Sequence, residues 1–238
     1  MTRAELLYAL AAAAANILGA LTVTTGARWG LRAIDLMLAF AAGFLISVAL
    51  LDLFPEAIRR TGEQAAAVAL VGYLLVHLTQ HTIAKHFHFG EETHAITRVV
   101  SVSALVGLLL HTFVDGVAVA SGARVSDALG MLVFLAVVLH KLPEGLAISS
   151  LFMAAGAGKR AALAAAGLLG AATIAGVFVT ARVGPLATHG LALSAGVTLY
   201  VGASNLVPEF QAKAGWQVPV SFFAGCALYV AARYAAGA

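Results

Sequence analysis

The stretch VVLHKLPEGLAISS, residues 137–150, places His140, Lys141 and Glu144 inside an otherwise apolar run. The surrounding segment 127–151 is long enough to cross a bilayer, which takes roughly 20 mainly apolar residues in a helix. Ionisable side chains at membrane depth are costly unless they are paired or reach water, so they mark a substrate pathway by default. The stretch therefore predicts a membrane-spanning helix that carries a functional site.

A second copy of the pattern, HTFVDGVAV, starts 29 residues earlier at His111. Both copies read His-x-x-x-acid-Gly-apolar-Ala-apolar, so His111 precedes Asp115 as His140 precedes Glu144. Residues four apart share one face of a helix. Two imidazoles and two carboxylates suit Zn²⁺ or Fe²⁺, whereas Ca²⁺ and Mg²⁺ prefer oxygen alone. We predict a metal site made by these four residues.

Pro143 lies between the acid and the histidine of the second copy. A proline inside a helix cannot donate a hydrogen bond and clashes with the carbonyl four residues earlier, here that of Leu139. We expect a broken helix lining a cavity, where such a break is tolerated. A plainer alternative is that the His–acid pairs only hold two helices together, but two copies at one offset favour a metal site.

Composition supports the membrane assignment. Hydrophobic residues make up 61% of the 238 residues and charged residues 11%, against about 25% charged in soluble domains. This excludes a soluble enzyme. The net charge of +3 comes without a basic run, so no nucleic-acid partner is expected. Cys226 is the only cysteine, which excludes a thiolate cluster.

Breaks in hydropathy predict an all-α membrane protein with eight transmembrane helices in one domain, residues 1–238. A His-rich linker covers about 85–97, and the balance of Lys and Arg between linkers weakly favours an N-terminus outside the cytoplasm. The predicted spans are 5–25, 33–54, 65–84, 98–121, 127–151, 160–182, 187–208 and 217–235.

The second and seventh spans share a further pattern. Both contain Ala-Gly and end in Leu-x-Pro-Glu, at a constant offset of 153 residues, which pairs Glu56 with Glu209 and Asp52 with Asn205. The two spans run in opposite directions, which is the inverted repeat of secondary transporters. We expect Asp52 and Asn205 to stabilise the scaffold by interhelical hydrogen bonds, and leave Glu56 and Glu209 open as pathway ligands or helix-end charges.

The paired motifs, His140-Lys-Leu-Pro-Glu-Gly-Leu-Ala and His111-Thr-Phe-Val-Asp-Gly-Val-Ala, resemble those of the ZIP (ZRT/IRT-like) metal transporters along the whole chain. The resemblance implies an inverted 3+2+3 arrangement, with three-helix repeats flanking two central helices that hold the transported metal. It also implies that the first and the fourth to sixth spans move as a bundle against the others. His111, Asp115, His140 and Glu144 would line the transport site.

Two departures from the family pattern are informative. Thr112 and Asp115 stand where the family usually has Asn and Glu, and Lys141 stands where many members use a carboxylate for a second metal. The sixth span also lacks the acid that some members add. Since a protonated Lys cannot bind metal, we infer one metal, with the Lys141 ammonium balancing the charge of Asp115 and Glu144. Snorkelling of Lys141 to an interface is the alternative.

Several further residues are candidate accessory metal ligands, although a solvated polar linker explains most of them equally well. They are His77, His81, His86, His88, His94 and Glu209.

The sequence predicts a multi-pass transporter in the plasma (bacterial inner) membrane that moves Zn²⁺, and also Fe²⁺, Mn²⁺ or Cd²⁺, into the cytoplasm. The metal is a substrate, no cofactor is expected, and a homodimer is a further expectation. The alternatives are an intramembrane metal-dependent hydrolase and a proton channel using the His–acid ladder.

Overall fold

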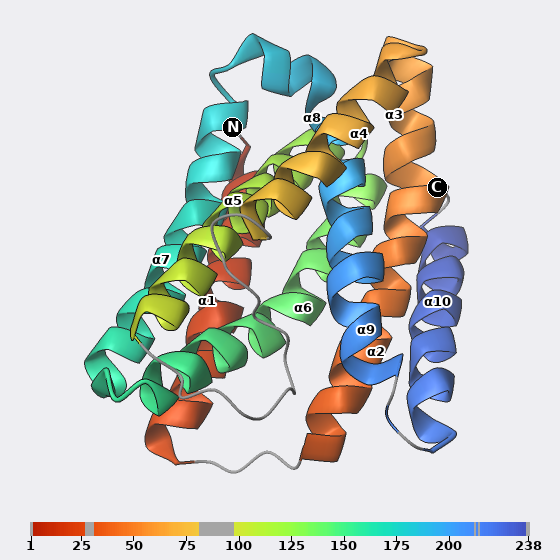
Figure 1. Cartoon of the computed structure of the whole chain (residues 1–238). Helices are drawn as coiled ribbons and strands as arrows, with labels where there is room; N and C mark the ends of the chain where they lie inside the picture. The colour runs from red at the N-terminus through yellow and green to blue at the C-terminus, as the bar shows by residue number, and fades with distance from the viewer. Residues whose placement is uncertain (1, 27–30, 81–97, 212, 214, 237–238) are drawn as a thin grey trace.

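The computed structural model describes residues 2–26, 31–80, 98–211, 213 and 215–236, and these contain helices and no strand (Figure 1). Seven described helical segments are long and apolar enough to cross a membrane, and an eighth apolar helix is shorter. The protein is therefore an all-α, multi-pass membrane protein. Its helices are α1 (Arg3–Thr25), α2 (Leu31–Val48), η1 (Ala49–Leu53), α3 (Phe54–Thr61), α4 (Gln64–Leu78), α5 (Arg98–Ala123), α6 (Asp127–Ala154), α7 (Gly158–Thr180), α8 (Gly184–Leu199), η3 (Tyr200–Leu206), α9 (Val207–Gln211) and α10 (Gln217–Ala235).

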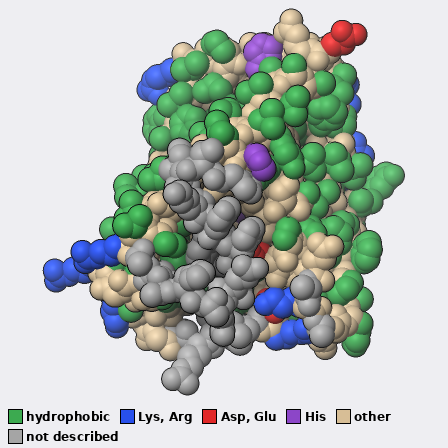
Figure 2. All heavy atoms as spheres, in the orientation of Figure 1, with side chains coloured by type: hydrophobic (Ala, Val, Ile, Leu, Met, Phe, Trp, Pro, Cys, Tyr) green, Lys and Arg blue, Asp and Glu red, His purple; other side chains and the backbone are tan. Residues whose placement is uncertain are grey.

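Large apolar side chains cover the outside of the helices. Leu7 of α1, Leu70 of α4 and Phe223 of α10 are more than half exposed, and hydrophobic side chains are widespread over the upper part and the right of the face drawn in Figure 2. Water would disfavour so large an apolar surface, whereas lipid tails do not. These side chains mark the faces that contact lipid.

The helices form two groups. One contains α1, α5, α6 and α7, with α1 packed on α6 and α7, and α5 on α6 and α7. The other contains α2 to α4 and α8 to α10, with α2 packed on α10 and α4 on α8. α1 and α7 lie to the left and α2 and α10 to the right in Figure 1. The groups meet where α5 packs on α8 and α6 on α2, and they contain the same spans that the family resemblance assigns to bundle and scaffold.

Two close helix crossings are related by the predicted offset of 153 residues. A Cβ on Gly43 of α2 would overlap the carbonyl oxygen of Phe222 in α10. A Cβ on Gly196 of α8 would overlap that of Ala69 in α4. Each residue of the first crossing lies 153 positions from its counterpart in the second. The inverted repeat is therefore present in the packing as well as in the sequence.

Two π-helical segments, η1 and η3, were not predicted. They precede Pro55 and Pro208, and the helix continues beyond each proline to Thr61 and to Gln211, so the predicted ends at 54 and 208 are too early. Proline lacks an N–H and crowds the carbonyl of the preceding turn. A wider π turn relieves this crowding without ending the helix.

Asp52 fixes η1 to α10. The buried carboxylate accepts hydrogen bonds from the Tyr229 hydroxyl and from Nε of Arg233, the latter at 3.0 Å. The predicted interhelical bonding is confirmed for Asp52. In the other repeat, Ser204, which precedes Asn205 in η3, hydrogen-bonds Tyr73 of α4 at 2.8 Å.

Candidate metal centre

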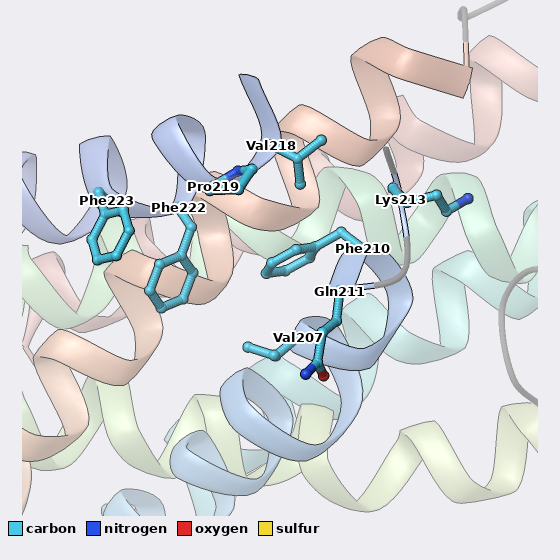
Figure 3. A pocket seen from close by; sticks show the side chains of 8 residues that line it. All are labelled: Val207, Phe210, Gln211, Lys213, Val218, Pro219, Phe222 and Phe223. Carbon is cyan, nitrogen blue, oxygen red and sulfur yellow. The ribbon is translucent and has the colours of Figure 1, made fainter. Parts of the chain in front are cut away.

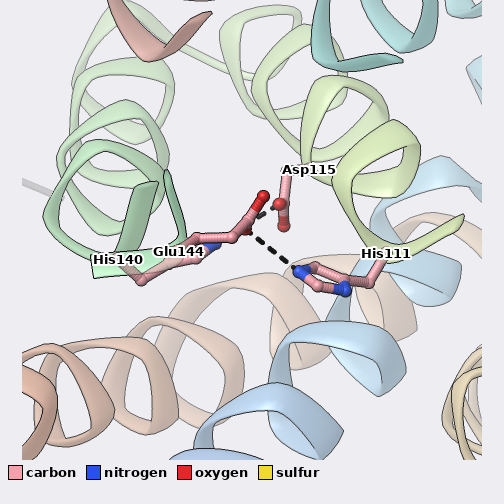
Figure 4. Close-up of side chains that lie close together, drawn as sticks. All are labelled: His111, Asp115, His140 and Glu144. Atoms are coloured by element: carbon pink, nitrogen blue, oxygen red, sulfur yellow. Dashed lines mark hydrogen bonds and ion pairs between the residues drawn. The ribbon is translucent and has the colours of Figure 1, made fainter. Parts of the chain in front are cut away.

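The four residues of the paired motif come together between α5 and α6 (Figure 4). His111, Asp115, His140 and Glu144 are all buried, and each offers a ligand atom within 4.8 Å of the others. The cluster lies near the boundary between the two helix groups, because α5 and α6 are the helices that contact α8 and α2.

Each histidine contacts the acid of the other helix. His111 Nε2 lies 3.2 Å from Glu144 Oε2, and His140 Nε2 lies 3.3 Å from Asp115 Oδ2. The i, i+4 spacing correctly places each His and its own acid on one face. The two helices then face each other, so the nearest partner of each imidazole comes from across the interface.

The second nitrogen of His140 indicates which form the ring takes. Nδ1 lies 2.9 Å from the carbonyl oxygen of Ala136, so Nδ1 carries a proton and donates it. In a neutral ring, the lone pair of Nε2 would then face the Asp115 carboxylate, which also only accepts. A proton or a metal ion between them satisfies both atoms, and an imidazole held by a backbone carbonyl is a usual metal ligand.

Lys141 is fully buried within the same cluster. Its Nζ lies 2.7 Å from Asp115 Oδ2 and 2.7 Å from Glu144 Oε2. It also donates to Thr112 Oγ1 at 3.1 Å, and Thr112 donates to Glu144 Oε1 at 3.0 Å. This position excludes snorkelling to the membrane surface. One ammonium therefore sits between the two carboxylates.

Glycines bring the outer helices against the acids. A Cβ on Gly145, next to Glu144, would overlap the carbonyl oxygen of Asn16 in α1. A Cβ on Gly116, next to Asp115, would overlap the carbonyl oxygen of Thr173 in α7. The backbones on both sides of the cluster are thus in direct contact, which fixes the positions of the acids.

Asn16 is the site residue that the sequence reasoning missed. Its Nδ2 donates to Glu144 Oε1 at 3.4 Å from the first span. The available signal was that Asn16 is the one amide side chain between Arg3 and Thr25.

The expected break at Pro143 is wrong, because α6 runs unbroken from Asp127 to Ala154. Neighbouring helices hold it along its length. Gly19 of α1 packs so closely that a Cβ there would overlap the Leu142 carbonyl oxygen. One missing backbone hydrogen bond does not break a helix that is supported in this way.

Two of the candidate accessory ligands lie within the described residues, and neither is part of the cluster. His77 lies on α4, with Nδ1 3.4 Å from the Tyr200 hydroxyl, and Glu209 lies on the short helix α9. Glu56 forms ion pairs with Arg59 and Arg60 on its own helix, as a helix-end charge would. The remaining predicted ligands lie outside the described residues: His81, His86, His88 and His94.

A pocket between α9 and the start of α10 offers a contrasting surface (Figure 3). Apolar side chains such as Phe210 and Phe222 line it, with Gln211 and Lys213 at its edge. Its lining contains no imidazole or carboxylate, so it lacks the ligands that a divalent metal needs.

Comparison with known proteins gives a consistent result. A family model described as ZIP Zinc transporter matches residues 77–231. The zinc transporter ZupT of Enterobacter sp. (strain 638) is 30% identical over 221 residues, covering 85% of each chain. The zinc transporters ZIP9-B and ZIP9-A of Xenopus laevis are 29% and 28% identical over 154 residues, which is 59% of this chain and 50% of theirs. The chain thus spans about half the length of the frog relatives and most of the bacterial one.

Proposed function

This chain belongs to the ZIP zinc transporter family, and on that premise we propose that it carries divalent transition-metal ions across a membrane. The route passes through His111, Asp115, His140 and Glu144. Zn²⁺ is the first candidate substrate, followed by Fe²⁺, Mn²⁺ and Cd²⁺. Transport runs toward the cytoplasm, across the plasma (bacterial inner) membrane, within one domain of 238 residues.

The observation that carries this proposal is the buried cluster of two imidazoles and two carboxylates between α5 and α6. Nitrogen and oxygen ligands in this combination suit zinc and other first-row transition metals. A structural His–acid clamp would need neither two copies nor a position at the boundary of two helix groups.

Lys141 sets the number of metal ions at one. With neutral imidazoles, Asp115 and Glu144 carry two negative charges and the ammonium offsets one of them. One divalent ion leaves a net charge of +1 in the site, whereas a second would leave +3 in a buried, poorly solvated place. The ammonium, which contacts both carboxylates, stands where a second metal would otherwise lie.

Movement of one helix group against the other gives access from alternate sides. The contacts of α5 with α8 and of α6 with α2 form the sliding boundary, and the glycine crossings hold each group together internally. Such relative motion around a midplane site is how inverted-repeat transporters work. His77, Glu209 and the histidines of the linker serve as accessory metal-binding residues.

Uptake into liposomes tests the proposal. Protein reconstituted with a zinc-sensitive dye inside should give a saturable rise of the signal that empty liposomes lack. A hydrolase using the same residues would give no uptake. A proton channel would acidify the interior without metal, which a pH dye reports. Either of those results would contradict metal transport.

A further inference from the structure

Asn16 lies at the level of Glu144, although α1 carries neither copy of the motif. Two glycines bring the helices into backbone contact there: Gly145 faces the Asn16 carbonyl oxygen, and Gly19 faces that of Leu142. The Asn16 side chain therefore has a fixed height along α6, next to the acid.

The amide of Asn16 is only half satisfied. The side chain is 0% exposed, and Nδ2 donates to Glu144 Oε1 at 3.4 Å. Its Oδ1 is buried and has no hydrogen-bond partner among the described residues. Rotating the amide would place Oδ1 against the carboxylate, where two acceptors repel, so the orientation with Nδ2 toward Glu144 is the stable one. A buried carbonyl oxygen without a donor is destabilising, so a ligand that satisfies it is favoured.

The equivalent position in the other repeat behaves differently. Thr173 and Gly176 of α7 lie 157 residues after Asn16 and Gly19, and they cross α5 beside Gly116. The Thr173 hydroxyl donates to the carbonyl oxygen of Leu169 within its own helix, at 3.4 Å. The unsatisfied oxygen is therefore a feature of the α1 side, next to Glu144.

We propose that Asn16 is a metal-binding residue whose Oδ1 ligates the transported ion together with the four motif residues. This inference rests on the proposed function and extends it. A neutral amide oxygen adds a fifth ligand without adding charge to a site that Lys141 already partly neutralises. Carbonyl and carboxylate oxygens suit Mn²⁺ better than softer ions, so Asn16 extends the substrate range toward Mn²⁺.

The test compares the KM of Zn²⁺ and of Mn²⁺ uptake by the full-length protein in liposomes. Asn16→Ala removes both halves of the amide, and alanine fits an Ala-rich helix without strain. We expect KM for Mn²⁺ to rise about tenfold, the lower end of what a lost partner of a metal site costs, and KM for Zn²⁺ to rise less. Asn16→Asp keeps a ligating oxygen, loses the donor and adds a negative charge, so its KM for Mn²⁺ should not rise above that of wild type if ligation is what matters.

Thr173→Val is the matched control, since it changes the equivalent crossing without touching the Glu144 side; its KM values should equal those of wild type. Unchanged KM values in Asn16→Ala would overturn the inference. So would an equal loss for both ions in Asn16→Ala and Asn16→Asp, because the amide would then act only as a donor to Glu144. If Asn16→Asp fails to fold, the Mn²⁺ to Zn²⁺ ratio in Asn16→Ala decides. A wild type that transports neither ion would instead refute the proposed function itself.

Discussion

The two helices that hold the cluster, α5 and α6, share one motif but distribute charge unequally. Thr112 of α5 and Lys141 of α6 occupy the same motif position, 29 residues apart. Lys141 contacts both acids. The Thr112 hydroxyl accepts a hydrogen bond from Lys141 and donates one to Glu144. A nearly symmetric pair of helices thus holds an asymmetric distribution of charge. The α6 half of the site supplies its own cation, which is the basis for proposing a single metal ion.

The two acids also differ in how many side chains contact them. Glu144 receives contacts from four side chains on two other helices and its own: His111, Thr112, Lys141 and Asn16. Asp115 contacts His140 and Lys141. Glu144 is therefore the more connected acid, and removing it should affect more of the site.

The largest expected effect is that of Glu144→Ala. We expect initial Zn²⁺ uptake to fall more than about 100-fold, beyond the usual cost of losing a supporting partner of a metal ligand. Asp115→Ala should cause a smaller loss, since fewer contacts depend on it. The measurement is uptake into liposomes, with insertion checked by size-exclusion chromatography. Wild-type uptake in Glu144→Ala would remove Glu144 from the site.

Lys141→Met tests the charge difference between α5 and α6, because it makes the α6 position as uncharged as Thr112. Two buried carboxylates would lose their counter-ion, and breaking a buried ion pair costs roughly 3–5 kcal/mol. The metal-free protein should unfold at a temperature lower by on the order of 10 °C. Added Zn²⁺ should then stabilise the variant more than it stabilises wild type. An unchanged melting temperature would mean that the ammonium does not balance the acids.

Gly145→Ala and Gly116→Ala test whether the backbone frame is symmetric. Each new methyl group would overlap a carbonyl oxygen of the crossing helix, and such overpacking costs about 1–3 kcal/mol. The two variants should show similar losses of thermal stability. Gly167→Ala in α7 is the control, because a Cβ there meets nothing within 4 Å. A stable Gly145→Ala beside an unstable Gly116→Ala would contradict the symmetric packing.

The smallest effect is expected from deleting the linker residues His86 to His94, which lie outside both motifs. Uptake should slow, or lose its regulation by metal concentration, without being abolished. The rate is measured over a range of external Zn²⁺. Complete loss in a correctly folded variant would place those histidines in the essential site.

Much of this arrangement follows from sequence patterns with a strict period. Hydropathy gives the spans, and the i, i+4 spacing gives the face on which His140 and Glu144 lie. The offset of 153 residues between Pro55 and Pro208 identifies the inverted repeat. These features were predictable because each depends on the order and spacing of residues along the chain.

The particular partners that side chains find across helix contacts were not predictable. The cross-pairing of His111 with Glu144 depends on how α5 faces α6. The π-helical turns before the prolines arise because neighbouring helices keep the chain helical where propensity alone would end it. Asn16 carries no motif of its own, and only the crossing at Gly145 brings it to the acid.

The most direct test of the central claim is a crystal structure of the Zn²⁺-loaded protein with the metal located by anomalous scattering. We predict one peak within the membrane, bounded by His111, Asp115, His140 and Glu144, with Lys141 beside it. The same measurement on Lys141→Asp should show a second peak, since a carboxylate replaces the cation and the electrostatic term for a nearby metal changes sign. Two peaks in the wild-type cluster, or one peak elsewhere in the membrane, would contradict a single metal site formed by these four residues.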